Sequence, residues 1–408
     1  MNAFKLNISQ AFVYALALVF FTACVPTQFK AYPLIVFFGL CLYLFFKGNR
    51  KINYALLLTN GLLYIGALIT LLYSEDLKGG VFTLQTMSPL LVFPVFFSLL
   101  PENQIETLKG RIHFFLTVYI CSVIAFNVLA FIWFWATRFS LTEMWIHFPT
   151  AVTEKMGRFS MHPIYASMHC ALALLFIFHR LNKTALNYVS SKLLLQILGI
   201  SILLFFLFFY AKKGPILAFF VCLSVWAIFQ HKKIHKCIKW GTLLLLVLVF
   251  LMPHTRQRFV EIVKPLNAKA EISSTQIRVL IYDAAIKQIK ESPMFGHGIG
   301  DYNDVLNTEL NNTYKEVLNG KTYNAHNQYL SFLLMGGLLL FSIFLLKLGV
   351  NLILAFRYNN LLLLWIILFY GIVMFTESIL VREDGVLFFA RRLFGFVCSR
   401  GVVPYVCS

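Results

Sequence analysis

The sequence predicts an all-α membrane protein with about 11–12 transmembrane helices and one large, partly helical loop between late spans. Hydrophobic residues make up 59% of the 408 residues and charged residues only 13%, about half the charge of a soluble protein. At roughly 20 residues per span, this composition allows about twelve helices. Helices are expected because lipid offers no partner to unpaired backbone groups.

Long apolar runs mark the expected spans. They are 10–27, 32–46, 53–73, 81–100, 112–137, 163–179, 191–211, 214–230, 238–253, 328–346 and 361–380, with a weaker run at 385–398. The chain is therefore divided into an N-terminal transmembrane region at 1–253 with about nine spans, a large loop at 254–325, and a C-terminal transmembrane region at 326–408 with two or three spans and an atypical terminus. The first run is predicted to be an uncleaved helix.

The basic residues predict the orientation. Alternating the spans from a cytoplasmic N-terminus places 18 of the 35 Lys and Arg residues inside, against two acidic residues. Cytoplasmic loops collect Lys and Arg, so the N-terminus is predicted to be cytoplasmic and 254–325 external. The C-terminus is cytoplasmic if the twelfth span forms. The net charge of +18 thus indicates orientation, and no nucleic-acid partner is expected.

The cysteines and carboxylates indicate no metal or cofactor. Five of the eight cysteines lie in or beside apolar runs, and no CxxC pair or His/Cys cluster is present. The sequence has no dense carboxylate cluster for a divalent cation. We expect no metal and no cofactor.

The large loop contains two predicted helices. Arg278 to Glu291 carries Ile281, Ala285, Ile286 and Ile289 at helical spacing, with Ser273–Thr275 as caps and Ser292-Pro293 as the end. A second polar helix is expected at 301–318. Between them lies Gly296-His297-Gly298-Ile299-Gly300. Because these glycines follow a helix rather than a strand, a structural turn is favoured over a nucleotide site.

Polar groups at the external ends of spans are the candidate functional residues. His326 and Asn327 open an apolar helix, and Lys212 and Lys213 stand between two closely spaced spans, against the positive-inside bias. Arg158, near His162, and Arg278 lie at other external ends. Lysines that snorkel to lipid phosphate and a histidine with a structural role are the alternatives. Converging cations would suit a diphosphate, and a neutral histidine could deprotonate an attacking hydroxyl.

Several segments resemble the O-antigen ligase/polymerase superfamily of bacterial membrane glycan transferases. They are STQIRVLIYDAAIKQIKESPMFGHGIGDYNDVL from Ser274, NAHNQYLSFLLMGG from Asn324, GRFSMHPIYASM from Gly157, AKKGPILAF from Ala211 and FTESILVREDGVLFF from Phe375. The motif of His, then Asn, nine residues and Gly is met by His326, Asn327 and Gly337. Leu340 departs from the Gly, Thr or Tyr of the pattern, and Lys213 stands where members commonly carry Arg.

The resemblance implies a metal-independent glycosyltransferase in the bacterial inner membrane with a periplasmic site. Arg278, Lys213 and Arg158 would hold the diphosphate of an undecaprenyl-diphosphate-linked glycan. His326 would activate the hydroxyl of the acceptor, which is lipid A–core or a growing glycan. Possible supporting residues are Asn327, Lys212, His162 and Glu377. Membrane lipids are the other expected partners.

Several functions share this chemistry. Ligation of O-antigen to lipid A–core is the first hypothesis. Polymerisation of O-antigen or capsule repeat units and protein O-oligosaccharyl transfer differ from it only in the acceptor. A lipid-linked glycan transporter is a separate class, which predicts charged or broken helices at the membrane midplane and related halves. A structural membrane protein is the remaining alternative.

Overall fold

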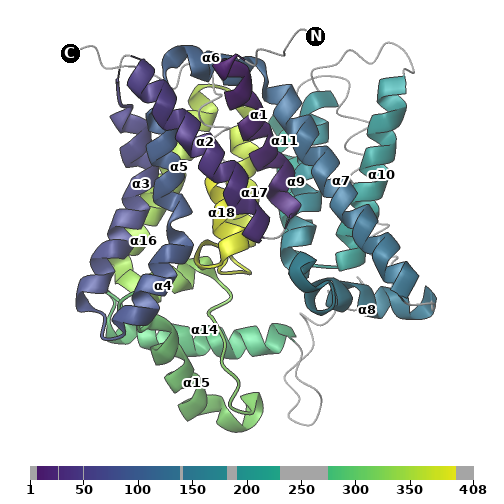
Figure 1. Ribbon diagram of the computed structural model, residues 1–408. Helices are drawn as coiled ribbons and strands as arrows, with labels where there is room; N and C mark the ends of the chain where they lie inside the picture. Colours follow the sequence, from purple (N-terminus) through teal and green to yellow (C-terminus); the bar gives the residue numbers. More distant parts are fainter. Residues whose placement is uncertain are drawn as a thin grey trace.

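The computed structural model describes residues 7–25, 27–48, 50–137, 141–181, 191–229 and 274–391. This part of the chain is all-helical and contains no strand, as the sequence predicts. The helices stand side by side in a bundle, and α14 and α15 lie below one of its ends (Figure 1). We call that end the loop end. The start of α1 lies at the opposite end.

The bundle is built from helices of different lengths, most of them apolar. They are α1 (Ile8–Phe21), α2 (Thr27–Lys47), α3 (Tyr54–Ile69), α4 (Leu77–Met87), α5 (Pro89–Ser98), α7 (Ile112–Thr137), α9 (Pro163–Leu181), α10 (Ser191–Tyr210), α11 (Lys213–Phe229), α16 (Gln328–Arg357), α17 (Leu361–Val373) and α18 (Glu383–Arg391). Short 3-10 turns extend the bundle helices or join them: η1 (Thr22–Cys24), η2 (Thr70–Tyr73), η3 (Gly157–Phe159) and η4 (Ile379–Val381).

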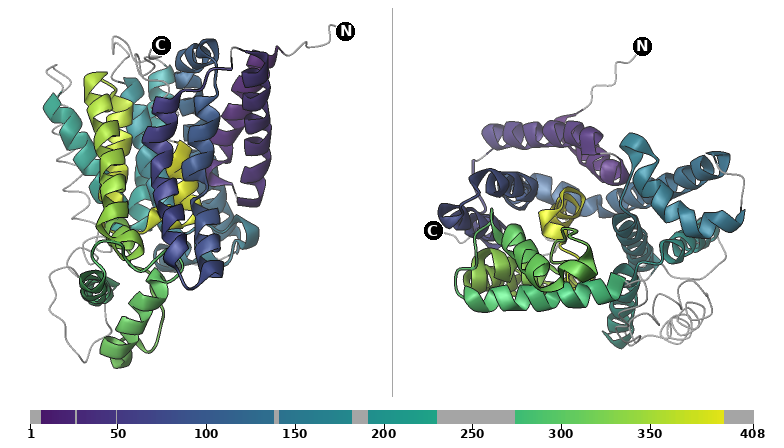
Figure 2. Two further views of the ribbon diagram at one scale, coloured as in Figure 1. Left: turned by 90° about the vertical axis from the view of Figure 1, so that its left-hand side faces the viewer. Right: turned by 90° about the horizontal axis from the view of Figure 1, so that it is seen from below.

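Four further helices lie at the ends of the bundle. They are α6 (Glu102–Gly110) at the end away from the loop, and α8 (Leu141–Glu154), α14 (Ser274–Glu291) and α15 (Tyr302–Leu318) at the loop end. Seen from below, α14 lies across the bundle (Figure 2). The sequence predicts α15 within one residue, whereas α6 and α8 were not predicted because neither contains a long apolar run.

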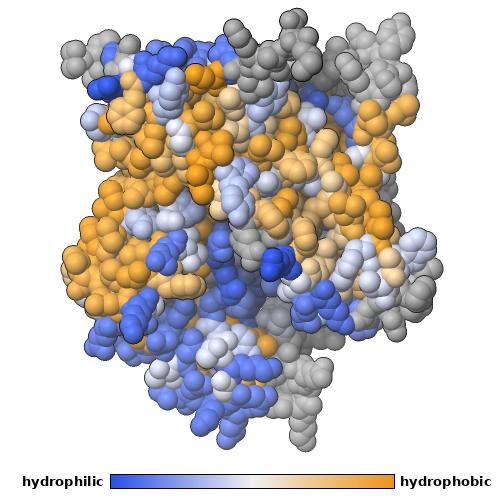
Figure 3. Space-filling model, viewed as in Figure 1, coloured by the Kyte–Doolittle hydropathy of each residue, from blue (hydrophilic) through white to orange (hydrophobic). Residues whose placement is uncertain are grey.

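The chain is a multi-pass membrane protein. Five helices in the described ranges are long and apolar enough to cross a membrane, or six if α4 and α5 form one bent span, and four shorter apolar helices accompany them. On the face that Figure 3 shows, a broad apolar region lies between two more hydrophilic ends. The predicted count of 11–12 is not confirmed, and the expected run at 238–253 lies outside the described residues.

Two of the predicted spans differ in the structure, and two lysines near span ends are buried. The run 81–100 falls in two helices that meet at an angle of 42°, because Pro89, the first residue of the second helix, has no N–H with which to continue the hydrogen bonds of the first. The predicted span 328–346 continues to Arg357. Lys347, which directly follows the predicted end of this span, is buried in α16 and donates to the Asn60 carbonyl at 2.7 Å. Lys30, which lies between the predicted runs 10–27 and 32–46, is buried and paired with Asp384 at 2.6 Å.

The helices of the bundle pack around α9 and α16, and α16 also contacts the loop helix α14. α9 packs against α7, α10 and α11, while α16 packs against α3, α14 and α17. The buried face of α14 consists of Ile281, Ala284, Ala285 and Gln288. Ile286, predicted to share that face, is 47% exposed. Its position two residues before Gln288 turns it about 160° around the helix, away from the bundle.

Candidate functional site

His326 and Asn327 stand where the loop returns to the bundle. The Asn327 side chain caps α16 by accepting the N–H groups of Tyr329 (2.9 Å) and Leu330 (3.2 Å). His326 adopts a left-handed backbone conformation with φ of 44°, which costs roughly 1–3 kcal/mol outside glycine. Its N–H donates to the Asn324 side chain at 2.9 Å. The surroundings thus hold a strained histidine at the mouth of the helix.

One carboxylate joins His326 to Arg278. Glu377 follows α17, and its Oε1 accepts a hydrogen bond from Arg278 at 2.6 Å. Its Oε2 lies 3.4 Å from His326 Nδ1. When Nδ1 carries the proton, the Nε2 atom of His326 keeps its lone pair and can accept a proton from a hydroxyl. The segment before α16, helix α14 and the segment after α17 therefore meet in one charged centre.

Glu377 is ionised in this centre. Burial raises the pKa of its carboxyl, but the hydrogen bond from His326 and the positive charges of Arg278 and the nearby histidines outweigh burial, so the pKa lies below its ordinary value of 4.5. An ionised partner fixes the imidazole and stabilises the imidazolium that forms when His326 takes up a proton.

Lys213 reaches the same centre from another helix. It begins α11, and its Nζ donates to Thr275 Oγ1 at 3.0 Å, one turn of α14 before Arg278. The following Gly214 lies against Thr376, since a Cβ at this glycine would be 2.4 Å from Thr376 Oγ1. Thr376 directly precedes the bridging glutamate. The structure thus brings Lys213, distant in sequence, beside the turn of α14 that carries Arg278.

His162 lies within electrostatic reach of the centre. Desolvation lowers its pKa, and the Glu377 carboxylate opposes that shift. Three positive groups lower the pKa further: Lys212, Arg382 and His326. His162 is therefore neutral at pH 7. Both Lys212 and His162, predicted as supporting residues, act on this centre through their charge or position.

Arg158 is the predicted cation that the structure does not bring into contact with the centre. It lies exposed in η3, four residues before His162. Within the described ranges its side chain makes no hydrogen bond or ion pair with another residue. It therefore stands at the edge of the site rather than within it.

Arg382 is a cation that the sequence analysis did not single out. It is exposed directly after η4, and its positive charge lowers the pKa of His162. It also acts on Tyr302, whose pKa burial raises to about 12. The sequence could have indicated Arg382 as a site residue only through its position five residues after Glu377. Folding brings its segment within electrostatic reach of His162.

Two hydroxyl groups that hold the histidine were also missed. The Tyr282 hydroxyl lies 3.2 Å from the His326 carbonyl and 3.0 Å from the Phe375 carbonyl. Ser378 Oγ accepts the Asn327 N–H at 3.2 Å. These contacts tie α14 and the segment after α17 to the start of α16. Neither residue type has a pattern that reveals such contacts in a sequence.

The glycine-rich turn at 296–300 packs against a break in helix α16. α16 leaves helical geometry at Gly336 and Gly337, and residues 293–298 fill the break: His297 N–H donates to the Leu334 carbonyl (2.7 Å) and Gly298 N–H to the Met335 carbonyl (2.9 Å). A Cβ on Gly296 would lie 2.6 Å from that Leu334 oxygen. The three glycines of the turn thus permit close backbone contact, and the favoured reading as a turn agrees with this packing.

Leu340, the residue that departs from the family pattern, packs in the contact between α16 and α3. Its side chain is 2% exposed. It lies against Gly336 and Gly66, whose added Cβ atoms would be 2.5 Å and 3.1 Å from Leu340 atoms. The larger side chain therefore fills space that two glycines leave at the α16–α3 contact.

The side chains of the centre suit an anion better than a metal ion. Among the side chains that the structure describes, no group of three or more His, Cys, Asp and Glu residues could hold a metal ion. The chemistry on offer is a His–carboxylate pair beside guanidinium and ammonium groups. Such an arrangement can bind a polyanion and move one proton.

Comparison with known proteins agrees with the resemblance seen in the sequence. Residues 198–345 match the family described as O-antigen ligase. This stretch contains Lys213, Arg278 and His326, whereas Glu377 and Arg382 follow it. None of the curated proteins matches the chain.

Proposed function

We propose that this chain transfers a glycan from an undecaprenyl-diphosphate carrier to an acceptor hydroxyl at the periplasmic face of the bacterial inner membrane. The match of residues 198–345 to the O-antigen ligase family supports a membrane glycosyltransferase-like enzyme. Ligation of O-antigen to lipid A–core is the reaction we favour. The observation that carries the proposal is the His326–Glu377–Arg278 centre at the mouth of α16.

The cations of the site fit the leaving group. Arg278 uses one nitrogen on Glu377, and the remaining donors of its planar guanidinium suit phosphate oxygens. Lys213 adds a point charge from α11, and Arg382 and Arg158 add charge at the rim. Donors already in place at the diphosphate stabilise the charge that develops as the glycosidic bond breaks. The proposed reaction uses no metal, so a chelator should leave transfer unchanged.

His326 acts as the general base in this proposal. Its Nε2 takes the proton of the acceptor hydroxyl while the oxygen attacks the anomeric carbon. The bond from that carbon to the diphosphate breaks, and the electron pair leaves with the diphosphate. Glu377 stabilises the imidazolium during the step. A single displacement of this kind inverts the anomeric configuration.

The test is transfer in membranes by the His326→Ala variant. We expect loss of about 10²–10⁴-fold in rate, the usual value of a general base, at unchanged protein level. Transfer at the wild-type rate would refute the role of His326.

A gel of lipopolysaccharide from a deletion strain identifies the acceptor. Long chains not attached to core indicate a ligase. Core that carries a single repeat indicates a polymerase, the alternative within the same chemistry, and unchanged lipopolysaccharide with unglycosylated protein indicates protein O-oligosaccharyl transfer. Purified protein that moves carrier lipid without releasing diphosphate would indicate a transporter.

A further inference from the structure

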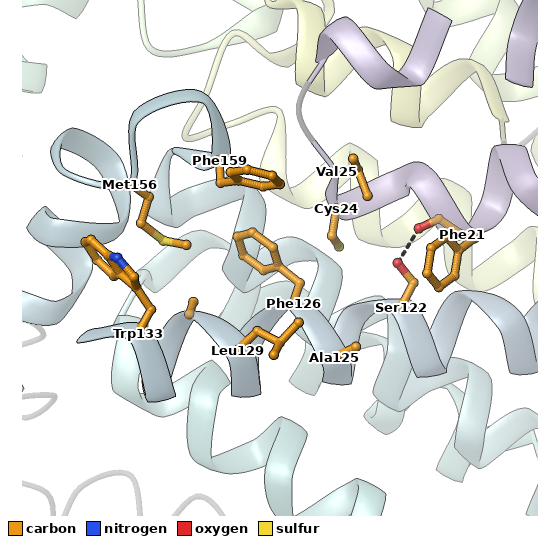
Figure 4. Close-up of a pocket in the computed structure, with 11 residues that line it drawn as sticks. Phe21, Cys24, Val25, Ser122, Ala125, Phe126, Leu129, Trp133, Met156 and Phe159 are labelled. Atoms are coloured by element: carbon orange, nitrogen blue, oxygen red, sulfur yellow. Dashed lines mark hydrogen bonds between the residues drawn. The ribbon is translucent and has the colours of Figure 1, made fainter. Parts of the chain in front are cut away.

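Two cavities of different chemistry lie toward opposite ends of the bundle. The first has a volume of about 360 Å³ and lies between η1, α7 and the segment around η3, with an apolar lining that includes Phe126 and Trp133 (Figure 4). The second, which we call the α6 cavity, has a volume of about 700 Å³ and lies between the end of α2, the turn before α3 and α6. Its lining includes apolar side chains and charges of both signs: Phe45, Arg50, Lys51, Leu99, Glu102 and Glu106.

The α6 cavity lies at the depth of lipid headgroups. Three apolar segments have their ends beside it: one candidate span ends at Lys47, the next begins at Tyr54, and the bent pair of α4 and α5 ends at Ser98. The ends of membrane-spanning helices lie where the hydrocarbon core meets the headgroups. Phe45 and Leu99, within two residues of these ends, form the apolar part of the wall. The cavity is therefore open to lipids rather than only to water.

The charges of the α6 cavity lie on separate walls. Arg50 and Lys51 come from the turn between α2 and α3, whereas Glu102 and Glu106 come from α6. Glu106 pairs with Lys109 of its own helix at 2.7 Å. Arg50 and Glu102 are exposed, and neither makes a hydrogen bond or ion pair with another residue in the described ranges. Two opposite charges that line one cavity without pairing leave room for a ligand that carries both signs.

The turn that carries Arg50 is held in an unusual conformation. Its φ of 49° lies in the left-handed region, which is strained for a residue with a Cβ atom and is found most often at ligand sites and switches. Its guanidinium lies 5.7 Å from the centre of the Phe46 ring. Asn53 N–H donates to the Ser98 carbonyl at 2.9 Å, which ties the turn to the end of α5. The cation is therefore positioned before any ligand binds.

We propose that the α6 cavity binds a membrane lipid with a phosphoethanolamine headgroup. Arg50 and Lys51 bind its phosphate, and Glu102 accepts the N–H groups of its ammonium. Phe45 and Leu99 pack against the glycerol and the first acyl carbons. A glycerol headgroup would leave Glu102 without a cation, and choline has no N–H to donate. The cavity lies at the end of the bundle away from the charged centre, so the inference stands independently of the proposed function.

The first experiment compares lipids on the unaltered protein. Native mass spectrometry in detergent gives the dissociation constant of the first lipid bound, for dioleoyl phosphatidylethanolamine, its N-methyl and N,N-dimethyl forms, phosphatidylcholine and phosphatidylglycerol. We expect phosphatidylethanolamine to bind about fivefold more tightly than phosphatidylcholine, the upper range for an exposed charge pair, with the methylated forms in between. Phosphatidylglycerol should bind no more tightly than phosphatidylcholine. Equal constants for all five lipids, or tightest binding of phosphatidylglycerol, would overturn the proposal.

The second experiment changes one wall at a time. Glu102→Gln should remove the preference for phosphatidylethanolamine over phosphatidylcholine, because the amide has no charge to attract the ammonium. Arg50→Gln should weaken both lipids by about fivefold, because both carry the phosphate. Arg111→Gln and Glu316→Gln, exposed outside the cavity, are the matched controls and should keep the wild-type constants. A preference that survives in Glu102→Gln, or that a control variant also removes, would contradict the site.

Discussion

His326 Nδ1 lies 3.4 Å from Glu377 Oε2, across the junction between the start of α16 and the segment after α17. The same carboxylate accepts Arg278 from α14 at 2.6 Å. A single side chain therefore orients the proposed base and holds one of the proposed diphosphate ligands. This relationship makes Glu377 a positioning residue with two partners.

Glu377→Gln should lower kcat by about 10²–10⁴-fold, because the amide keeps the shape but loses the charge that supports the imidazolium. KM for the donor should also change as Arg278 loses its ionic partner. Steady-state transfer by the purified variant measures both constants. Glu383→Gln, an exposed carboxylate on the next turn of the chain, is the control, and equal activity of the two variants would argue against the role.

Acid should weaken the fold through Glu377. Its pKa is lowered in the folded protein, so the carboxylate contributes stability that is present above the unfolded pKa near 4.5 and is lost as the pH falls through the lower folded value. Thermal unfolding in detergent should therefore separate wild type from Glu377→Gln at pH 7, and the difference should vanish once the pH falls below the folded pKa of Glu377. A separation that persists at low pH would assign the effect to packing.

Lys213→Ala should abolish transfer, since it removes a cation that contacts Thr275, one turn of α14 before Arg278. Lys213→Arg should retain most activity, because the charge stays and the guanidinium can grip two phosphate oxygens. Transfer assays at matched protein level check both variants, with the exposed Lys321→Ala as the control. Unaltered activity in Lys213→Ala would favour a lysine that only contacts lipid phosphate.

Gly337→Ala should detach the glycine-rich turn from α16. Gly337 has φ of 58° and ψ of −155°, and a Cβ there would lie 2.3 Å from the Met294 carbonyl carbon. Backbone strain and overlap should cost about 2–4 kcal/mol of stability. Gly349→Ala in the same helix meets no atom within 4 Å, so it should be neutral or stabilising by up to about 1 kcal/mol. Thermal unfolding and limited proteolysis of the loop compare the two.

The apolar helices could be predicted because their cause is local. Runs such as 112–137 have the same bounds in the structure as in the sequence, since length and hydropathy alone decide them. The helix break at Gly336 and Gly337 was not predictable from the run, because it depends on residues 293–298 filling the gap. The glycine of the family motif, Gly337, is therefore explained by a tertiary contact.

The candidate site was predictable only in part. His326, Lys213 and Arg278 were identified because charged or polar groups at the ends of apolar runs are unusual and expensive. Arg382 was overlooked and Arg158 was singled out, since residue type and position near a span end are alike for both. That Arg382 acts on His162 follows from the packing of its segment in the folded chain.

By itself, the sequence determined the membrane class, most helices, the resemblance to the superfamily and the types of residue at the candidate site, because these follow from composition and short-range pattern. Only the tertiary structure decided that Glu377 joins His326 to Arg278, that Lys213 reaches α14 and that an apolar cavity opens beside η3. Such features depend on distances of a few ångströms between segments far apart in the chain, and those distances are set by the packing of whole helices.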